Sequence, residues 1–160
     1  MNTAYLLTGS NLGDSIANLR QAANLLNKRC GDIFIQSSLY ETGAWGKTDQ
    51  PAFLNQSVGL KTLMDARQLL QEVLAIEQKM GRIREERFGP RLIDIDILLF
   101  NEAVFNLPFL KIPHPELQNR RFALTPLAEI AADKIHPVFY KTISELLAEC
   151  KDELPVKKYT

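Results

Sequence analysis

The sequence predicts an α+β fold, with elements in the order β-α-β-β-α-β over residues 4–100. Apolar residues recur at helical spacing in two segments and form short strand-like runs in four others. The chain has 160 residues, 46% hydrophobic and 24% charged, which is an ordinary globular balance. No repeat, low-complexity tract or linker interrupts it, so we expect one domain over residues 1–160.

The first strand and helix flank a glycine-rich turn. Residues 4–8 form an apolar run, and the apolar period of residues 16–29 predicts a helix capped by Asp14 or Ser15. Such a turn can cradle a phosphate at a helix N-terminus. Residues 9–14 match neither the P-loop nor the dinucleotide fingerprint, so a tight turn with a helix cap is favoured for this stretch alone.

The second and third strands, residues 33–40 and 53–63, enclose a polar loop that carries the only tryptophan, Trp45. Trp45 either stacks on a ligand ring or anchors the loop to the core. In the third strand Phe53, Asn55 and Ser57 share one face. An aromatic ring and an amide can hold a flat heterocycle, although a packing pair with a solvated Asn is the simpler interpretation of this strand alone.

A second helix starts after Asp65 and ends at Gly81, and residues 82–91 follow it with four arginines, two glutamates and a Gly-Pro pair. The composition of residues 82–91 predicts a mobile loop rather than a core element. Such a charge run is usually a solvated surface, but arginine is also the side chain suited to bidentate phosphate contact. The run leads directly into the fourth strand.

The fourth strand, residues 93–100, carries the most informative pattern. Its three isoleucines, at 93, 95 and 97, share one face, and Asp94, Asp96 and Leu98 share the other. Most such acidic pairs are a solvated strand face. Here, however, the carboxylates lie between apolar flanks and beside the arginine run. Mg²⁺ takes carboxylate and phosphate oxygens, so this arrangement fits a magnesium-bound nucleotide triphosphate.

The last third of the chain predicts a short hairpin ending at residue 112, a helix over residues 119–130 and a final helix over residues 143–150. His114 stands between two prolines and is equally consistent with a phosphate contact and a plain turn. Arg120 and Arg121 would add to a cationic wall, with Phe122 as a stacking ring. The polar tail from residue 151 is expected to be loose.

Composition excludes several classes of function. The formal net charge is zero, so no global field attracts nucleic acid or a membrane surface. No apolar run has the length of a membrane span, and no secretory signal opens the chain. Cys30 and Cys150 are expected to be free thiols, which fits a cytoplasmic protein.

Taken in order, these segments resemble the 6-hydroxymethyl-7,8-dihydropterin pyrophosphokinase family of folate biosynthesis. The matching residues are 9–13, 40–42, 50–51, 53–55, 77, 81–84, 88–100, 113–115 and 119–122. The resemblance implies a ferredoxin-like fold, a central mostly antiparallel sheet flanked by helices, with long mobile catalytic loops. It also implies a Mg²⁺-dependent transfer of pyrophosphate from ATP to the pterin hydroxymethyl group, which gives the pterin diphosphate and AMP.

The resemblance implies the following residue roles. Two Mg²⁺ ions would bind Asp94 and Asp96, and the catalytic residues would be these two with Arg82 and Arg91. The ATP-binding residues would be Glu77, Arg82, Arg84, Arg91, Ile97, His114 and Arg120. The pterin-binding residues would be Thr42, Gly43, Ala44, Trp45, Phe53, Asn55 and Phe122. We expect a monomer with no nucleic-acid or membrane partner.

The chain departs from the family pattern at Gly43, Phe53, Phe88 and Leu92. Phe53 lacks a phenol hydroxyl, and Gly43 should loosen the loop on the pterin side. None of the four is an expected metal ligand. Two other functions share part of the pattern: a different Mg²⁺-dependent nucleotidyl or phosphoryl transferase, and a nucleic-acid-binding module built on the arginine run, which the zero net charge disfavours.

Overall fold

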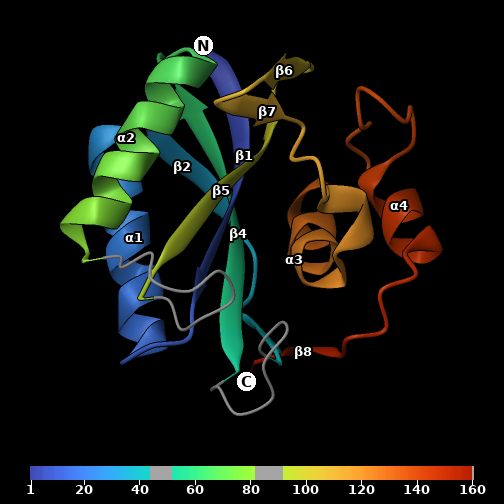
Figure 1. The fold of residues 1–160 in the computed structure, drawn as a ribbon, viewed down its shortest axis with the longest axis horizontal. Helices are drawn as coiled ribbons and strands as arrows, with labels where there is room; N and C mark the ends of the chain where they lie inside the picture. The colour runs from blue at the N-terminus through green and yellow to red at the C-terminus, as the bar shows by residue number, and fades with distance from the viewer. Residues whose placement is uncertain (44–51, 82–91, 160) are drawn as a thin grey trace.

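A computed structural model describes residues 1–43, 52–81 and 92–159 of the chain. It is an α+β fold, in which helices α1 and α2 cover one face of a central antiparallel sheet and α3 and α4 lie on the other side (Figure 1). The strands are β1 (Asn2–Ser10), β2 (Asp32–Gln36), β3 (Tyr40–Thr42), β4 (Phe53–Thr62), β5 (Asp94–Phe100), β6 (Phe105–Leu107), β7 (Leu110–Ile112) and β8 (Val156–Lys158). The helices are α1 (Ser15–Arg29), α2 (Ala66–Lys79), the short 3₁₀ helix η1 (Leu117–Asn119), α3 (Arg121–Ala131) and α4 (Ile143–Glu149).

The main sheet has the order β5-β1-β4-β3-β8, and β2 pairs with β4 beside β3. Every pairing is antiparallel. Over β1 to β5, with β2 and β3 counted as one interrupted strand, this is the β-α-β-β-α-β order expected of a ferredoxin-like fold, with β5 beside β1. The fold class expected from the sequence is therefore confirmed.

Local sequence signals place the first two helices. Asp14 caps α1, because its carboxylate accepts from the Ala17 N–H at 3.1 Å. Asp65 and Gln68 form a reciprocal capping box at the start of α2. The turn of residues 9–14 is thus a helix entry, as the sequence favoured.

Two apolar cores lie on opposite faces of the sheet. One packs α1 and α2 against β1, β4 and β5, and it includes the three isoleucines of residues 93–97. The other packs α3 and α4 against Leu7, Leu98 and Leu99. The alternation expected for β5 is confirmed, because the isoleucines face α1 and α2 while Asp96 and Leu98 line a pocket on the α3 side.

The strand expected over residues 33–40 is wrong in one respect: it is two strands, β2 and β3, with a break at residues 37–39. At the break, the Ser38 N–H and hydroxyl both donate to Glu129 of α3 instead of pairing with β4. The Ser37 N–H still donates to the Ser57 carbonyl at 2.9 Å, but the Ser57 N–H donates to the Ser37 hydroxyl at 2.9 Å, where a continuous strand would have offered a backbone carbonyl.

The expectation of a loose C-terminal tail is also wrong. Residues 156–158 form β8, which pairs with β3 in the register Tyr40–Lys158 to Thr42–Val156. The Tyr159 N–H donates to the Leu39 carbonyl at 2.8 Å and extends this contact. Backbone pairing orders a polar segment here, although no apolar period marks it.

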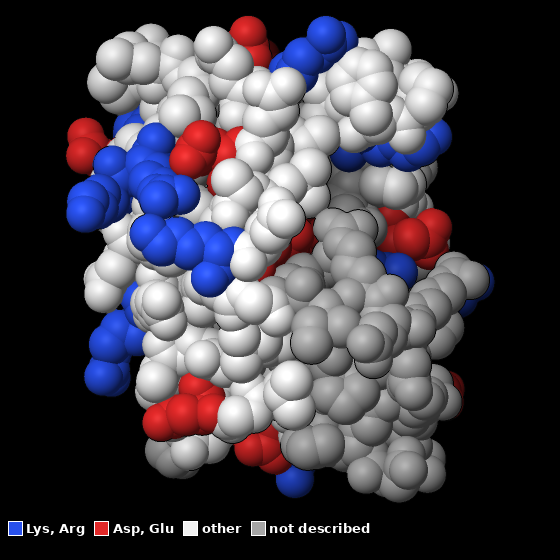
Figure 2. All heavy atoms as spheres, turned by 60° about the vertical axis from the view of Figure 1, so that its left-hand side comes forward, with Lys and Arg blue, Asp and Glu red and all other residues white. Residues whose placement is uncertain are grey.

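The surface carries both signs of charge on the side of α1 and α2, where Lys and Arg side chains lie among Asp and Glu (Figure 2). Cys30 and Cys150 are both free thiols. Within the described ranges, no helix combines the length and the apolar character needed to cross a membrane.

Candidate active site

The candidate site lies where β4, β1 and β5 place three residues in one row. Gly9 lies opposite Asn55 in one register and opposite Asp94 in the other. Directly opposed residues share a face, so Asn55 and Asp94 project from the same face with only a glycine between them. Two strand spacings separate them by about 10 Å. A flat molecule held by Asn55 would therefore reach the aspartates across Gly9.

Gly9 leaves room for the Asn55 amide. A Cβ atom at residue 9 would lie 2.5 Å from Asn55 Nδ2, so any larger side chain would displace the amide. Asn55 is only 5% exposed, and its Nδ2 donates to the Thr8 carbonyl at 3.2 Å. Its Oδ1 is buried and has no hydrogen-bond partner among the described residues. The interpretation of Asn55 as solvated is thus wrong.

A buried acceptor without a partner is costly, about 1–3 kcal/mol. Such a group calls for a partner from outside the chain, and a bound ligand that donates an N–H would supply one. The surrounding residues suit a flat ring: Phe53 lies two residues along the same face, and Thr42 is opposite Phe53 in the β3–β4 register. Thr42 is buried, and its hydroxyl donates to the Pro155 carbonyl at 2.8 Å.

Asp94 and Asp96 are partly exposed on β5, the end strand of the sheet. Behind them, Glu77 of α2 is 5% exposed, and its Oε2 accepts from the Ile95 N–H at 2.7 Å. That bond turns the Ile95 amide away from β1. Because strand backbone groups alternate in direction, the N–H and C=O of Ile97 also face the outer edge of β5.

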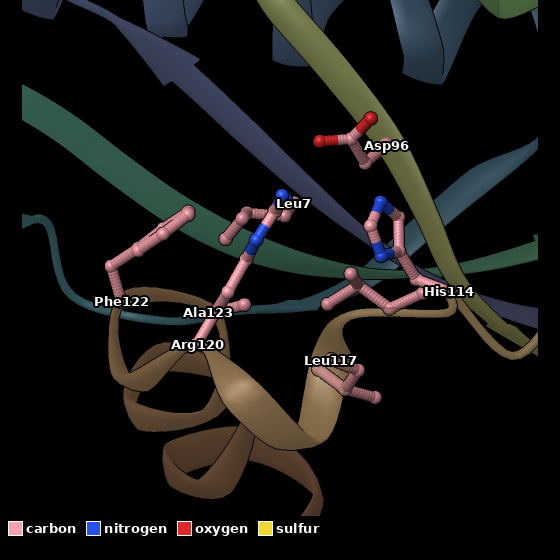
Figure 3. A pocket seen from close by; sticks show the side chains of 8 residues that line it. Leu7, Asp96, His114, Leu117, Arg120, Phe122 and Ala123 are labelled. Atoms are coloured by element: carbon pink, nitrogen blue, oxygen red, sulfur yellow. The ribbon is translucent and has the colours of Figure 1, made fainter. Parts of the chain in front are cut away.

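A pocket on the α3 side brings four expected site residues together (Figure 3). It is lined by Asp96 of β5, His114 of the β7–η1 connection, and Arg120 and Phe122 at the start of α3. Asp96 lies beside the His114 ring, and Arg120 extends into the same space. The Arg120 guanidinium lies 5.8 Å from the centre of the Phe122 ring. Residues that are far apart in sequence thus combine a carboxylate, an imidazole, a guanidinium and an aromatic ring.

His114 is held in a defined orientation. The peptide bond before Pro113 is cis, and the His114 N–H donates to the Leu98 carbonyl at 3.0 Å. Its Nδ1 accepts from the Glu116 N–H at 3.1 Å, so in the neutral ring the proton is on Nε2. Burial lowers the pKa of His114, and Arg120 adds to this effect, while Asp96 and Glu116 oppose it. The ring therefore offers a neutral Nε2–H donor, which suits a phosphate oxygen.

Several expected site residues lie outside the described residues: Arg82, Arg84, Arg91, Ala44 and Trp45, and with them the loops expected to be mobile. Their roles stay predictions. Among the described residues, Gly43 precedes the first of these gaps, and a Cβ atom there would lie 3.8 Å from Leu154. The nucleotide roles of Glu77 and Ile97 are also untested predictions.

One expected site residue points elsewhere. The Arg121 guanidinium donates to the carbonyl oxygens of Cys150 at 2.8 Å and Asp152 at 2.9 Å, so it is not part of the cationic wall. The sequence interpretation also missed Glu129, which accepts from the Tyr40 hydroxyl at 2.6 Å. The position of Glu129 among the apolar residues of α3 was the one feature of the sequence that could have indicated this contact.

The donor set fits magnesium better than a metal held by protein groups alone. Within the described ranges, no three His, Cys, Asp or Glu side chains gather as a site made of protein ligands alone would require. Mg²⁺ usually takes one or two carboxylates and completes its shell with waters and substrate phosphates. Asp94 and Asp96 are such a pair of carboxylates, and Asp96 lines a pocket that also holds an imidazole and a guanidinium.

Comparisons with known proteins agree on one family. The family model of 7,8-dihydro-6-hydroxymethylpterin-pyrophosphokinase (HPPK) matches residues 5–132. A 2-amino-4-hydroxy-6-hydroxymethyldihydropteridine pyrophosphokinase of Bacillus subtilis is 45% identical over 130 residues, 81% of this chain and 78% of that protein. One of Aquifex aeolicus is 40% identical over 149 residues, 93% of this chain and 92% of that protein.

The structural comparison gives the same fold. The crystal structure of Plasmodium falciparum HPPK-DHPS with pteroate has a TM-score of 0.77 at 19% identity. The match covers 92% of this chain, which spans only 44% of that longer protein. At this identity the likeness bears on the fold alone.

Proposed function

Because this chain belongs to the 7,8-dihydro-6-hydroxymethylpterin-pyrophosphokinase family, we propose that the row Asn55–Gly9–Asp94 and the adjoining pocket form its active site. The family reaction, in folate biosynthesis, transfers pyrophosphate from ATP to the hydroxymethyl group of 6-hydroxymethyl-7,8-dihydropterin. The bond that forms joins the hydroxymethyl oxygen to the β-phosphorus. The bond from that phosphorus to the α-phosphate bridge breaks, and AMP leaves.

The observation that carries the residue assignment is the buried Oδ1 of Asn55, which has no hydrogen-bond partner within residues 1–43, 52–81 and 92–159. A pterin ring edge carries N–H donors, and its plane suits the faces of Phe53 and Phe122. We assign Thr42, Gly43, Phe53, Asn55 and Phe122 to the pterin side, with Ala44 and Trp45 from the segment outside the described residues. Asn55 then fixes the ring so that its hydroxymethyl group points across Gly9 towards the aspartates.

The triphosphate is proposed to lie in the pocket between β5 and α3. His114 Nε2–H and the Arg120 guanidinium are donors for its oxygens, and the outward-facing backbone of Ile97 can bind a purine edge. Arg82, Arg84 and Arg91 are proposed to add phosphate contacts. Glu77 supports this side from beneath, through its bond to the Ile95 N–H.

Asp94 and Asp96 would hold two Mg²⁺ ions. Bound there, magnesium would neutralise phosphate charge and favour ionisation of the attacking hydroxyl. The protein's contribution is to orient: Asn55 positions the acceptor, His114 and Arg120 position the donor, and the β5 backbone sets the spacing of the two carboxylates. We further propose that residues 1–160 act as one domain, as a monomer and in the cytoplasm.

Product analysis by chromatography tests this proposal. The purified chain is incubated with ATP, Mg²⁺ and 6-hydroxymethyl-7,8-dihydropterin, and an Asp96→Asn variant serves as the matched control. We expect AMP in equal amount to pterin diphosphate in the wild type and neither product in the control. ADP in place of AMP would mean that a single phosphoryl group moved. No turnover by a folded, Mg²⁺-supplied wild type would refute the proposed site.

A further inference from the structure

Residues 150–159, the C-terminal strap, connect the two sides of the proposed pterin site. One end of the strap contacts the start of α3, beside Arg120 and Phe122, and the other end pairs with β3, which carries Thr42. The family model matches only residues 5–132, so the strap lies beyond the matched region.

Asp152 makes the contact at α3. Its Oδ2 accepts from the Arg121 N–H at 3.0 Å, and its Oδ1 accepts from the Leu154 N–H at 3.0 Å. The N-cap residue of α3, Arg120, makes no side-chain cap bond of its own. A carboxylate from 31 residues further along the chain therefore caps this helix, where negative charge is favourable. Arg121 completes the contact through its two bonds to the strap carbonyl groups.

The far end of the strap holds β3. Val156 lies opposite Thr42 in the β3–β8 register, and the Thr42 hydroxyl donates to the Pro155 carbonyl. The strand β3 has three residues, which pair with β4 on one edge and with β8 on the other. On the face of β3 that also carries Thr42, the Tyr40 hydroxyl donates to Glu129 of α3, and burial and that bond raise the pKa of Tyr40 to about 12. β3 is thus connected to α3 in two ways, directly through the Tyr40–Glu129 bond and indirectly through the strap.

From these contacts we infer that Asp152 is a positioning residue that sets the separation between Thr42 on β3 and Phe122 on α3, and with it the fit of the pterin ring. The inference rests on the proposed function. Asp152 touches neither substrate; it acts through the strap. Its loss should weaken pterin binding more than ATP binding, because the strap contacts an element on each side of the pterin site but, on the ATP side, only the segment that carries Arg120.

The test compares Asp152→Ala with Thr142→Ala. Thr142 caps α4 in a capping box with Glu145, so its replacement also removes a helix cap but leaves the strap intact. Pterin and ATP dissociation constants are measured by calorimetry, each ligand alone, at a temperature where both variants are fully folded. For Asp152→Ala we expect pterin binding about tenfold weaker and a clearly smaller loss of ATP binding, an effect of a size typical for residues without ligand contact. Thr142→Ala should change neither constant.

Hydrogen exchange gives a second readout that does not depend on ligands. Asp152→Ala should speed exchange of the amides of residues 40–42 and 156–158, and Thr142→Ala should not. Asp152→Asn keeps one carbonyl acceptor and should give a smaller change in the same direction. It replaces the alanine variant if that variant fails to fold.

Three results would overturn the inference: unchanged pterin binding in Asp152→Ala, an equal loss of pterin and ATP binding, or an equal effect of Thr142→Ala. A wild type that forms no AMP and pterin diphosphate in the product analysis would instead refute the proposed function. The two failures are therefore distinguishable.

Discussion

Replacing Asn55 with leucine separates a functional amide from a structural one. Leucine has the same branching as asparagine but cannot form hydrogen bonds. The variant loses the Nδ2 bond to the Thr8 carbonyl, which stabilises the fold by about 1 kcal/mol. It also removes the buried Oδ1 that lacks a partner, which relieves a cost of about 1–3 kcal/mol. The free energy of unfolding should therefore stay equal or rise by up to about 2 kcal/mol.

Pterin binding should change in the opposite direction. Without Oδ1, a ring N–H of the bound pterin is buried without an acceptor, which costs about 1–3 kcal/mol, or roughly 5- to 150-fold in affinity. Urea unfolding gives the stability, and equilibrium dialysis with pterin alone gives the affinity. The expected pattern is a stable variant that binds its acceptor substrate poorly.

Ser57→Ala is the matched control. Ser57 lies two residues along the same strand and face, is also buried, and donates to a β1 carbonyl, that of Leu6, at 3.1 Å. Its hydroxyl has a partner, so the control should lose about 1 kcal/mol of stability and keep its pterin affinity. If Asn55→Leu instead loses stability as the control does and binds pterin normally, the Asn55 amide is structural and the reasoning fails.

Three further predictions follow from the site and its surroundings. Asp94→Asn and Asp96→Asn should each lower turnover by roughly 100-fold or more with little change in the unfolding midpoint, and near-normal turnover would remove that residue from the metal site. Gly9→Ala should weaken pterin binding as Asn55→Leu does, because the new Cβ displaces the amide; unchanged affinity in dialysis would show that the amide is free to move. Burial lowers the pKa of His136, so the unfolded chain binds a proton below about pH 6.5 that the folded chain does not, and stability falls as the pH decreases. Urea unfolding of His136→Asn between about pH 7 and pH 5 should show a shallower fall than the wild type, and an equal slope would assign the effect to other groups.

Local patterns made much of this fold predictable. The caps at Asp14 and Asp65 and the alternation in β5 act within a few residues, so they can be read directly from the sequence. Asn55 was misjudged as solvated because its burial depends on α3, which covers that face of the sheet from a distant part of the chain. Periodicity indicates which residues share a face, but not what covers that face.

The remaining differences also depend on long-range contacts. The break between β2 and β3 follows from bonds between Ser38 and Glu129, 91 residues apart. The strand β8 has no apolar pattern and exists because β3 offers an open edge and Asp152 secures the strap. Arg121 looked like its neighbour Arg120 in sequence, yet helix geometry turns it towards the strap.

The bond between Glu77 and the Ile95 N–H has a consequence for the protein's behaviour in solution. An unpaired strand at the end of a sheet is a template on which a second molecule can add its own strand. Among the described residues β5 is the end strand of the sheet, and the buried carboxylate of Glu77 occupies one of the amides that an incoming strand would need. At the opposite end, β8 carries the exposed Lys157 and Lys158, whose charges oppose the same addition. Glu77, which holds the backbone between Asp94 and Asp96, thus also helps to prevent strand addition between two molecules.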